Sequence, residues 1–380
     1  MKKIFSLFLL FSSVYLAGCQ SSSSSPSSFS SSNCSAILVD TIMVVDSVRL
    51  VNPVPGNLYF NAFPSLTITG SGKYILGYQK GNGDANCCGV PVIRWTMDPR
   101  KGWSDSTVME TDSTQNYRNC QVSAYGDTVY MTYFNEDLTN RNHYGQVFFR
   151  ISTDAGLTWS VKTQVRSQAG KATDPYHDTL ANEGKLVKFK NKLIVPVYAL
   201  YQGNGGPAGF VISNSLDTWR TDTAVWITEP PASSAGLTEC NMITIGDSLV
   251  AFFRGNDGFT LFRSSSYDGI VWTPVVNVTP PYYLGSKPAL FRMPDGRIIL
   301  NYRSSSNEGN FGQIGISCNN GFSFTLAYKQ QPYLEFYYGD LVQGTNGNEI
   351  VNVYSLWTGT YTGNPGIATL YCMIYKIPAQ

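Results

Sequence analysis

Ser152 to Trp159 read Ser-Thr-Asp-Ala-Gly-Leu-Thr-Trp, and this stretch decides the fold. The hydroxyl of Ser152 and the carboxylate of Asp154 can hydrogen-bond the amides of their own turn, and Gly156 tolerates a positive φ angle. The indole of Trp159 supplies a large apolar anchor where the next strand starts. The stretch therefore predicts a tight turn between two β-strands, with a structural and not a catalytic role.

Degenerate copies of this turn recur along the chain. They are Thr96-Asp98-Trp103, a shortened copy from Ser213 to Trp219, Ser265-Asp268-Gly269-Trp272 with the Asp shifted by one position, and Ser317-Asn319-Gly321-Phe324. Six strand openings stand 48 to 63 residues apart: Phe63-Pro64-Ser65-Leu66, Cys120-Gln121-Val122, Glu183-Gly184-Lys185-Leu186, Glu239-Cys240-Asn241-Met242, Lys287-Pro288-Ala289-Leu290 and Tyr338-Gly339-Asp340-Leu341. An apolar strand, a polar turn and a second apolar strand follow each opening, and long helical patterns are absent.

Six repeats of this period predict an all-β protein, a six-bladed β-propeller of four-stranded antiparallel blades. We expect a strand from residues 36–51 to supply the outer edge of the last blade, since closure of this kind removes exposed sheet edges. A pair of β-sandwiches is the alternative, and six repeats in phase argue against it. The turn resembles the Asp-box, or BNR repeat, of the sialidase (neuraminidase) superfamily, and this resemblance extends from Phe63 to the C-terminus.

The N-terminus stands outside the predicted fold. Two lysines precede an apolar run that ends in Leu16-Ala17-Gly18-Cys19, which resembles the lipobox of bacterial lipoproteins. Lipidation of Cys19 would hold the protein at the bacterial cell envelope, and Gln20 after the cysteine favours the outer membrane by resemblance. An ordinary secretory signal is the alternative. The predicted organisation is a signal peptide over residues 1–18, a lipidated Ser-rich tether over residues 19–35 and the propeller over residues 36–380.

The composition excludes several classes of function. The chain has 24 Tyr, 20 Phe and 35 Gly but only 14% charged residues, and its formal net charge of +1 does not indicate nucleic-acid binding. His143 and His177 are the two histidines of the chain, so we expect no metal and no cofactor. Lipidation of Cys19 leaves seven cysteines, of which at least one must be free. We expect a monomer whose partners are a glycan and a lipid bilayer.

Polar side chains stand where the predicted inner strands start and where the second strands end. In a propeller these positions converge on one face around the central channel, which is where we expect the site. The candidates are Asp84 in a Gly-rich loop of the first repeat, Glu183 and Glu239 at the third and fourth openings, Arg254 and Arg303 at the ends of two second strands, and Tyr337 and Tyr338 at the sixth opening.

This order of residues resembles the catalytic set of the exo-α-sialidases. The resemblance implies that Tyr338 (or Tyr337) is the nucleophile, that Glu239 activates it, that Asp84 is the acid/base, and that Arg254 and Arg303 are two of three arginines that bind the carboxylate of sialic acid. A neutral tyrosine suits this reaction because a carboxylate nucleophile would be repelled by the substrate's own carboxylate. The resemblance therefore implies a glycoside hydrolase that removes a terminal acidic sugar.

Two positions depart from the family pattern. Ala62 stands where the first arginine of the clamp is expected. Val353-Tyr354-Ser355 contains no acid where the family has the glutamate that steadies that arginine. A clamp of two arginines lacks about one charge-assisted contact, worth roughly 1.5–3 kcal/mol.

Two further functions fit the same sequence. A glycan-binding propeller without activity is favoured by the missing arginine and by aromatic residues expected at the rim, namely Tyr59, Phe60, Tyr282, Tyr283, Tyr337 and Trp357. A glycosidase or lyase for another sugar would use Glu183 and Glu239 as its two carboxylates, a pairing that resembles the exo-arabinanases.

Overall fold

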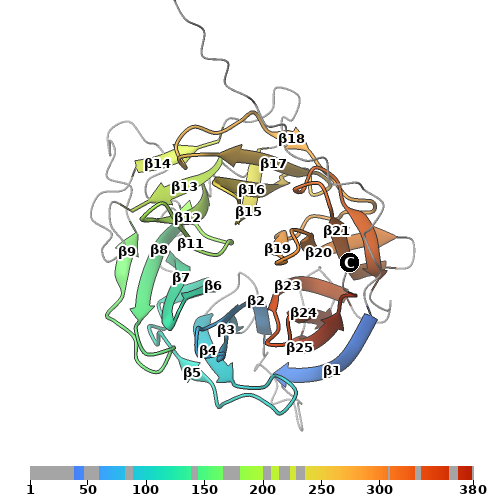
Figure 1. Cartoon of the computed structure of the whole chain (residues 1–380). Helices are drawn as coiled ribbons and strands as arrows, with labels where there is room; N and C mark the ends of the chain where they lie inside the picture. Colours follow the sequence, from blue (N-terminus) through green and yellow to red (C-terminus); the bar gives the residue numbers. More distant parts are fainter. Residues whose placement is uncertain are drawn as a thin grey trace, which may run out of the picture.

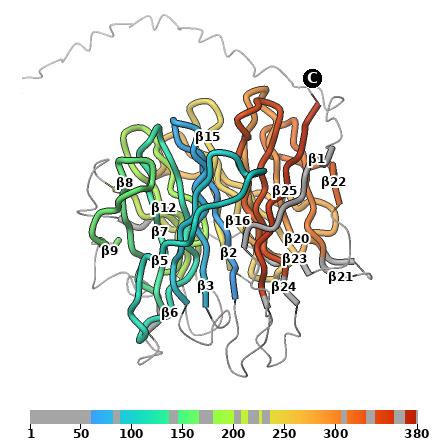
Figure 2. Tube along the Cα trace, turned by 90° about the horizontal axis from the view of Figure 1, so that it is seen from below, coloured from blue at the N-terminus to red at the C-terminus, as the bar shows by residue number. Residues whose placement is uncertain are grey.

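The described part of the chain is built from β-strands arranged around a central axis. The computed structural model describes residues 38–46, 60–81, 89–137, 144–165, 180–199, 207–213, 223–227, 236–306, 309–329, 335–358 and 367–378. Every regular element in these ranges is a strand, which confirms the all-β prediction. Figure 1 shows the sheets arranged radially, and Figure 2 shows their strands running side by side along the axis. Within the described ranges, no helix is long and apolar enough to cross a membrane.

Three repeat units each form a four-stranded antiparallel sheet, as the sequence predicts. The second unit comprises β6 (Gln115–Tyr125), β7 (Thr128–Asp137), β8 (Tyr144–Ser152) and β9 (Thr163–Val165). The fourth unit comprises β15 (Leu237–Ile245), β16 (Ser248–Gly255), β17 (Leu261–Ser266) and β18 (Val276–Asn277). The fifth unit comprises β19 (Ala289–Arg292), β20 (Ile298–Ser306), β21 (Gly309–Ser317) and β22 (Thr325–Lys329).

The third unit has an interrupted first strand. It comprises β10 (Leu180–Ala181), β11 (Val187–Phe189), β12 (Lys192–Ala199), β13 (Ala208–Ile212) and β14 (Thr223–Trp226), and both β10 and β11 pair with β12. The predicted opening at Glu183 falls in the gap between β10 and β11. A Cβ atom on Gly184 would overlap the carbonyl of Cys240 in the fourth unit, so only glycine permits this close approach of the two backbones.

One eight-stranded sheet joins the two ends of the described chain. It contains β2 (Phe60–Ile68), β3 (Tyr74–Gly81), β4 (Val90–Thr96) and β5 (Thr107–Val108) of the first unit, with β23 (Glu335–Gln343), β24 (Glu349–Thr358) and β25 (Ile367–Lys376) of the sixth. A single parallel pair, Phe60 with Ala368, links β2 to β25. β1 (Leu38–Asp46) runs antiparallel along β25, which confirms that the N-terminal segment supplies an outer strand of the last unit (Figure 1).

The recurring turn has the hydrogen bonds that its sequence predicts. Ser152 Oγ accepts the amide of Gly156 at 2.8 Å, and Asp154 Oδ1 accepts the amide of Thr158 at 2.9 Å. Gly156 has a φ of +81°. In the fifth unit the Ser317–Asn319–Gly321 copy closes in the same way, with Ser317 Oγ accepting the amide of Gly321 at 2.9 Å.

The copy in the fourth unit corrects our alignment of that turn. Ser266, and not Ser265, provides the hydroxyl that accepts the amide of Gly269 at 2.8 Å and lies 3.0 Å from Asp268 Oδ1. The spacing from Ser to Asp is therefore the ordinary one, and the Gly comes one residue early. In the third unit most of the shortened copy, residues 214–219, lies outside the described residues.

The apolar core lies between neighbouring sheets. Phe134 and Val147 of the second unit pack with Leu193 and Val195 of the third. At the axis the contacts are polar instead. Asp340 is fully buried, and its Oδ2 lies 2.9 Å from Lys185 Nζ, 2.8 Å from the amide of Leu66 and 3.1 Å from Ser65 Oγ. A buried carboxylate needs partners for its charge. Asp340 finds them in the first and third units, so it connects those two units with the sixth.

Candidate functional site

Four central strands are irregular at the same level. The register shifts between Ala62 and Ser65 in β2, between Arg118 and Gln121 in β6, between Thr238 and Cys240 in β15 and between Phe336 and Tyr338 in β23. The residues at three of these shifts, Phe63, Asn119 and Glu239, have φ angles of +53°, +54° and +39°. Such backbone costs about 1–3 kcal/mol per residue, and a bulge redirects the side chain it carries. The four bulges therefore define the level of the candidate site.

Tyr338, Glu239 and Arg254 meet at this level through one carboxylate oxygen. The hydroxyl of Tyr338 donates to Glu239 Oε1 at 2.7 Å, and Nη1 of Arg254 donates to the same oxygen at 2.5 Å. The side chains of Glu239 and Arg254 are only 9% and 24% exposed, so water screens the pair weakly. The charge of Glu239 raises the pKa of Arg254 above its already high ordinary value.

Arg303 joins this group through Gly285. Nη2 of Arg303 donates to the carbonyl of Gly285, and the amide of Arg303 donates to Ser286 Oγ at 3.0 Å. A Cβ atom on Gly285 would overlap Nε of Arg254 and lie 2.9 Å from the Cα of Gly258. The two guanidinium groups from neighbouring units therefore lie on either side of one glycine that has no room for a side chain.

Aromatic packing occupies the position of the expected first arginine. Ala62 is fully buried, and the ring of Phe63 packs on the ring of Tyr338 with centroids 4.8 Å apart. Ser355, where the family has a glutamate, accepts the amide of Tyr338 at 3.3 Å and donates to its carbonyl at 3.2 Å. Ser355 and Phe63, the neighbour of Ala62, thus support the backbone and the ring of Tyr338.

Glu183 is buried in the third unit, where it contacts the second unit. The side-chain amide of Asn119 donates to Glu183 Oε2, and the carboxylate is 2% exposed. Tyr198 lies near the end of β12, and the charges of four residues shift the pKa of its phenol. Burial raises the pKa of Tyr198 well above its ordinary value, and the negative charges of Glu183 and Glu239 raise it further, while Arg118 and Arg254 lower it.

The structure describes five of the eight predicted site residues with their side chains. Tyr338, Glu239 and Arg254 are in contact, Arg303 adjoins them through Gly285, and Glu183 is buried and accepts the side-chain amide of Asn119. The other three, Asp84, Cys19 and the side chain of Tyr337, lie outside the described residues.

The predicted aromatic rim is wrong for two of its members. Phe60 is 1% exposed and Tyr283 is 5% exposed, so neither ring can stack on a sugar. Phe60 packs among the apolar residues of the first and sixth units, and the hydroxyl of Tyr283 donates to the carbonyl of Ser286 at 2.9 Å. Tyr282 is 68% exposed, with a φ of +60°. The alternation of buried and exposed residues along a strand could not predict which of Tyr282 and Tyr283 is buried, because the two residues lie in and directly after a turn at Pro281.

Sequence reasoning missed two residues of the site, Tyr198 and Arg118. Tyr198 ends the second strand of the third unit, which is the position that Arg254 and Arg303 occupy in theirs. Arg118 immediately precedes a bulge, as Ala62 does in the first unit. Alignment of the repeats at the bulge, instead of at the strand opening, would have found Arg118, and alignment of the second strands would have found Tyr198.

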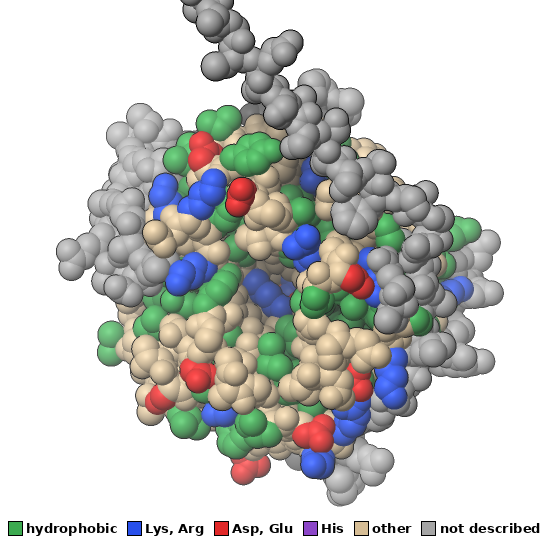
Figure 3. All heavy atoms as spheres, viewed as in Figure 1, with side chains coloured by type: hydrophobic (Ala, Val, Ile, Leu, Met, Phe, Trp, Pro, Cys, Tyr) green, Lys and Arg blue, Asp and Glu red, His purple; other side chains and the backbone are tan. Residues whose placement is uncertain are grey.

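Basic side chains lie at the centre of one face, and the described residues form no metal-binding cluster. Figure 3 shows one face hollowed at its centre, with basic side chains in the hollow. Among the described residues, no cluster of three His, Cys, Asp or Glu is arranged to hold a metal. Cys120, Cys240 and Cys372 are buried free thiols, and burial raises the pKa of each.

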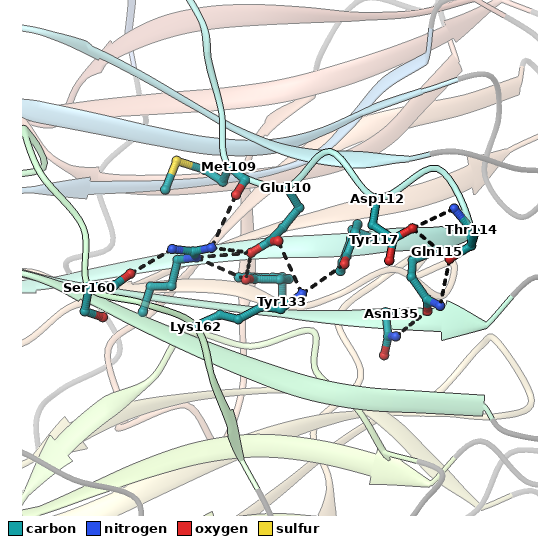
Figure 4. Close-up of polar contacts among 11 residues, drawn as sticks. Met109, Glu110, Asp112, Thr114, Gln115, Tyr117, Tyr133, Asn135, Ser160 and Lys162 are labelled. Carbon is teal, nitrogen blue, oxygen red and sulfur yellow. Dashed lines mark hydrogen bonds and ion pairs between the residues drawn. The ribbon is translucent and has the colours of Figure 1, made fainter.

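A second polar network lies in the second unit, around Glu110. Its Oε1 accepts Nη2 of Arg150 at 2.7 Å and the hydroxyl of Tyr133, and Lys162 Nζ lies 3.4 Å from Oε2 (Figure 4). Nη1 of Arg150 also donates to the carbonyl of Ser160 at 2.7 Å, just after the recurring turn. This network joins the third and fourth strands to the loop before β6, so its role is structural.

Comparison with known proteins agrees with this architecture. The family described as a BNR repeat-like domain matches residues 89–351. No curated protein sequence matches the chain. A Dyadobacter fermentans protein of unknown function has a similar structure, with a TM-score of 0.69, 16% identity, and coverage of 90% of this chain and all of that one.

Two sialidase structures are also similar. The intramolecular trans-sialidase from Ruminococcus gnavus aligns with a TM-score of 0.63 and 14% identity, covering 84% of this chain and 94% of that one. The NanB sialidase from Streptococcus pneumoniae aligns with a TM-score of 0.62 and 12% identity, covering 83% and 68%. The chain therefore belongs to the BNR repeat-like family and shares its fold with the sialidases.

Proposed function

We propose that the protein is a glycoside hydrolase of the sialidase type that removes a terminal acidic sugar from a glycan. The observation that carries this proposal is the contact of Tyr338, Glu239 and Arg254 through one buried oxygen. A phenol hydrogen-bonded to a buried carboxylate can lose its proton as it attacks, which is how a neutral nucleophile is activated.

In the proposed reaction, Oη of Tyr338 attacks the anomeric carbon while its proton passes to Glu239. The glycosidic C–O bond breaks, and the leaving oxygen takes a proton from Asp84. Water then attacks the anomeric carbon of the glycosyl–tyrosine intermediate and gives a proton to Asp84. The bond to Tyr338 breaks, and its oxygen recovers the proton from Glu239.

Arg254 and Arg303 would bind the carboxylate of the sugar, with Tyr337 beside them. Both guanidinium groups lie next to Gly285, and arginine binds carboxylates in a bidentate manner without losing its charge. Glu239 Oε2 is buried without a hydrogen-bond partner among the described residues, so it remains available to a ligand.

Release of sugars from a mixed set of glycans tests this function. The purified protein is incubated with sialylated, uronic-acid and arabinose-containing glycans, and the products are identified by mass spectrometry. Release of an acidic sugar supports the proposal, and its loss in Tyr338→Phe links it to the nucleophile. Release of a neutral sugar that survives Tyr338→Phe would point instead to Glu183 and Glu239 as a carboxylate pair.

A glycan-binding protein without hydrolytic activity is the second candidate. It is favoured by Ala62 and Ser355, because the position of the family's first arginine and its glutamate is filled by groups that support Tyr338. Retention of glycans on the protein without any product would favour this function over hydrolysis.

We further propose that the six units form one closed six-bladed propeller tethered to the cell envelope through Cys19. The radial arrangement in Figure 1 and the contact of β2 with β25 support the ring. A crystal structure with fewer or more than six blades would refute it. The lipobox-like Leu-Ala-Gly-Cys supports the tether. Incorporation of a labelled fatty acid that is lost in Cys19→Ser, with the protein recovered in the outer membrane fraction, is the expected result.

A further inference from the structure

Arg118 occupies in the second unit the position that Ala62 occupies in the first. In β2 the residues Ala62 and Ser65 face Gln79 and Gly77, and in β6 the residues Arg118 and Gln121 face Phe134 and Thr132. The two bulges therefore have the same length, and each lies in the first half of its strand. Because bulges of one kind aim their side chains alike, Arg118 and Ala62 are equivalent in their units.

A glutamate steadies Arg118 from the next strand. Nη1 of Arg118 donates to Glu136 Oε1 at 2.7 Å, and Oε2 of the same carboxylate accepts the side-chain amide of Asn116 at 2.9 Å. Glu136 lies near the end of β7, the second strand of its unit. An arginine before the bulge and a glutamate on a second strand are the two parts that the first and sixth units lack, and the second unit contains both.

The guanidinium of Arg118 reaches toward the site. Its Cζ lies 5.6 Å from the ring centroid of Phe63, the residue that packs on Tyr338. It lies equally far from the ring of Phe134, and its side chain is 16% exposed. Both rings lie within the range of cation–π attraction and favour a cation at this position.

The charge of Arg118 shifts the pKa of the same phenol, that of Tyr198, as the charges of Glu239 and Arg254. The negative charges of Glu183 and Glu239 raise the pKa of Tyr198, and the positive charges of Arg118 and Arg254 lower it. An anionic sugar between them would contact arginines from the second and fourth units instead of the first and fourth.

We propose that Arg118 is a substrate-binding residue that supplies the third cation for the carboxylate of an acidic sugar, in place of the arginine absent at Ala62. This inference rests on the proposed function. Because the third cation comes from the second unit, the proposed clamp is built on the second, fourth and fifth units. Arg118 is thus a residue that determines which acidic sugar is accepted.

Direct binding of monosaccharides tests the role of Arg118. Isothermal titration calorimetry compares the full protein with Arg118→Met, Arg118→Lys and Arg254→Met, and uses N-acetylneuraminic acid, glucuronic acid and, as a neutral probe, L-arabinose. Arg263→Met is the matched control, since Arg263 also lies over a phenylalanine ring, Phe322 at 3.9 Å, but on the third strand of the fourth unit. Thermal melts check that each variant is folded.

We expect Arg118→Met to weaken binding of at least one acidic sugar about 10- to 100-fold, because one charge-assisted contact is lost. Arg118→Lys should recover part of the affinity because it keeps the charge. Binding of arabinose, where present, and the control variant should be unaffected. If Arg118→Met does not fold, Arg118→Met/Glu136→Gln removes both partners of the pair and takes its place.

The outcomes separate this inference from the function on which it rests. If an acidic sugar binds and Arg254→Met abolishes binding while Arg118→Met does not, Arg118 has no such role and the proposed function stands. If the unaltered protein binds neither acidic sugar, both are overturned. An equal loss of acidic and neutral binding in Arg118→Met would show a structural role and would also overturn the inference.

Discussion

The hydroxyl of Tyr338 lies 2.7 Å from Glu239 Oε1, and these two residues come from the sixth and the fourth units. Arg254 donates to the same oxygen, so one carboxylate oxygen accepts from both a phenol and a guanidinium. Removal of any of the three changes the surroundings of the other two. The site therefore has to be tested with conservative substitutions and with pairs of them.

Substitution of Tyr338 by Phe should abolish sugar release while the protein remains folded. The ring still packs on Phe63, and only the hydroxyl that donates to Glu239 is lost. Mass spectrometry of released sugars measures the effect. Tyr302→Phe is the matched control, because its hydroxyl bonds Gln313 at 2.6 Å within the fifth unit. Turnover of Tyr338→Phe equal to that of the control would rule out Tyr338 as the nucleophile.

The pair of Glu239 and Arg254 should show coupled effects on stability. Glu239→Gln and Arg254→Met each leave a buried charge with a weakened partner, and we expect each to cost about 2 kcal/mol in the free energy of unfolding. The double variant should cost less than both together, by about 1–3 kcal/mol. Urea denaturation measures all three.

Arg263 provides the control for that cycle. Glu239→Gln and Arg263→Met share no hydrogen-bond partner among the described contacts, so their costs should add within about 0.5 kcal/mol. Additive costs for Glu239 and Arg254 as well would mean that their 2.5 Å contact does not contribute to stability.

Gly285→Ala should weaken the binding of acidic sugars. The new methyl group would overlap Nε of Arg254 and displace its guanidinium, and it would also lie 2.9 Å from the Cα of Gly258, so the variant should lose stability as well. Calorimetric titration with N-acetylneuraminic acid and glucuronic acid measures the loss. Gly347→Ala, where the nearest atom would be 3.9 Å away, is the control, and equal affinities of the two variants would contradict the prediction.

Glu110 should make the stability of the protein depend on pH in the acidic range. Burial raises the pKa of Glu110, but the hydrogen bonds from Tyr133 and Arg150 and the charges of Arg150 and Lys162 outweigh burial, so the folded pKa lies below the ordinary 4.5. A lowered folded pKa adds stability that is complete above 4.5 and is lost as the pH falls below it.

Glu110→Gln tests this dependence. At pH 7 the variant should be less stable by about 3 kcal/mol, since Arg150 loses its buried partner. The difference from the unaltered protein should shrink as the pH falls below 4.5. Glu349→Gln, which breaks the pair with Arg100 in another part of the molecule, shows whether the effect is particular to Glu110. A difference that is constant from pH 7 to pH 3 would contradict the assignment.

The sequence by itself determined the repeats, their turns and the positions from which side chains reach the axis. A turn such as Ser152–Gly156 closes through contacts four residues apart, so its hydrogen bonds can be predicted from the residues alone. The same local logic predicted that Glu239, Arg254 and Tyr338 stand at strand ends. It failed by one residue at Ser266, where a deletion after Asp268 shifted the pattern.

Only the tertiary structure decided which of those side chains meet. Tyr338 and Glu239 are 99 residues apart in the chain, and Ser65 and Asp340 are 275 apart. Bulges at Phe63, Asn119 and Glu239 set the direction of each side chain, and no periodicity of two residues reveals a bulge. The equivalence of Arg118 to Ala62 follows from those bulges, because a one-residue shift changes which face a side chain occupies.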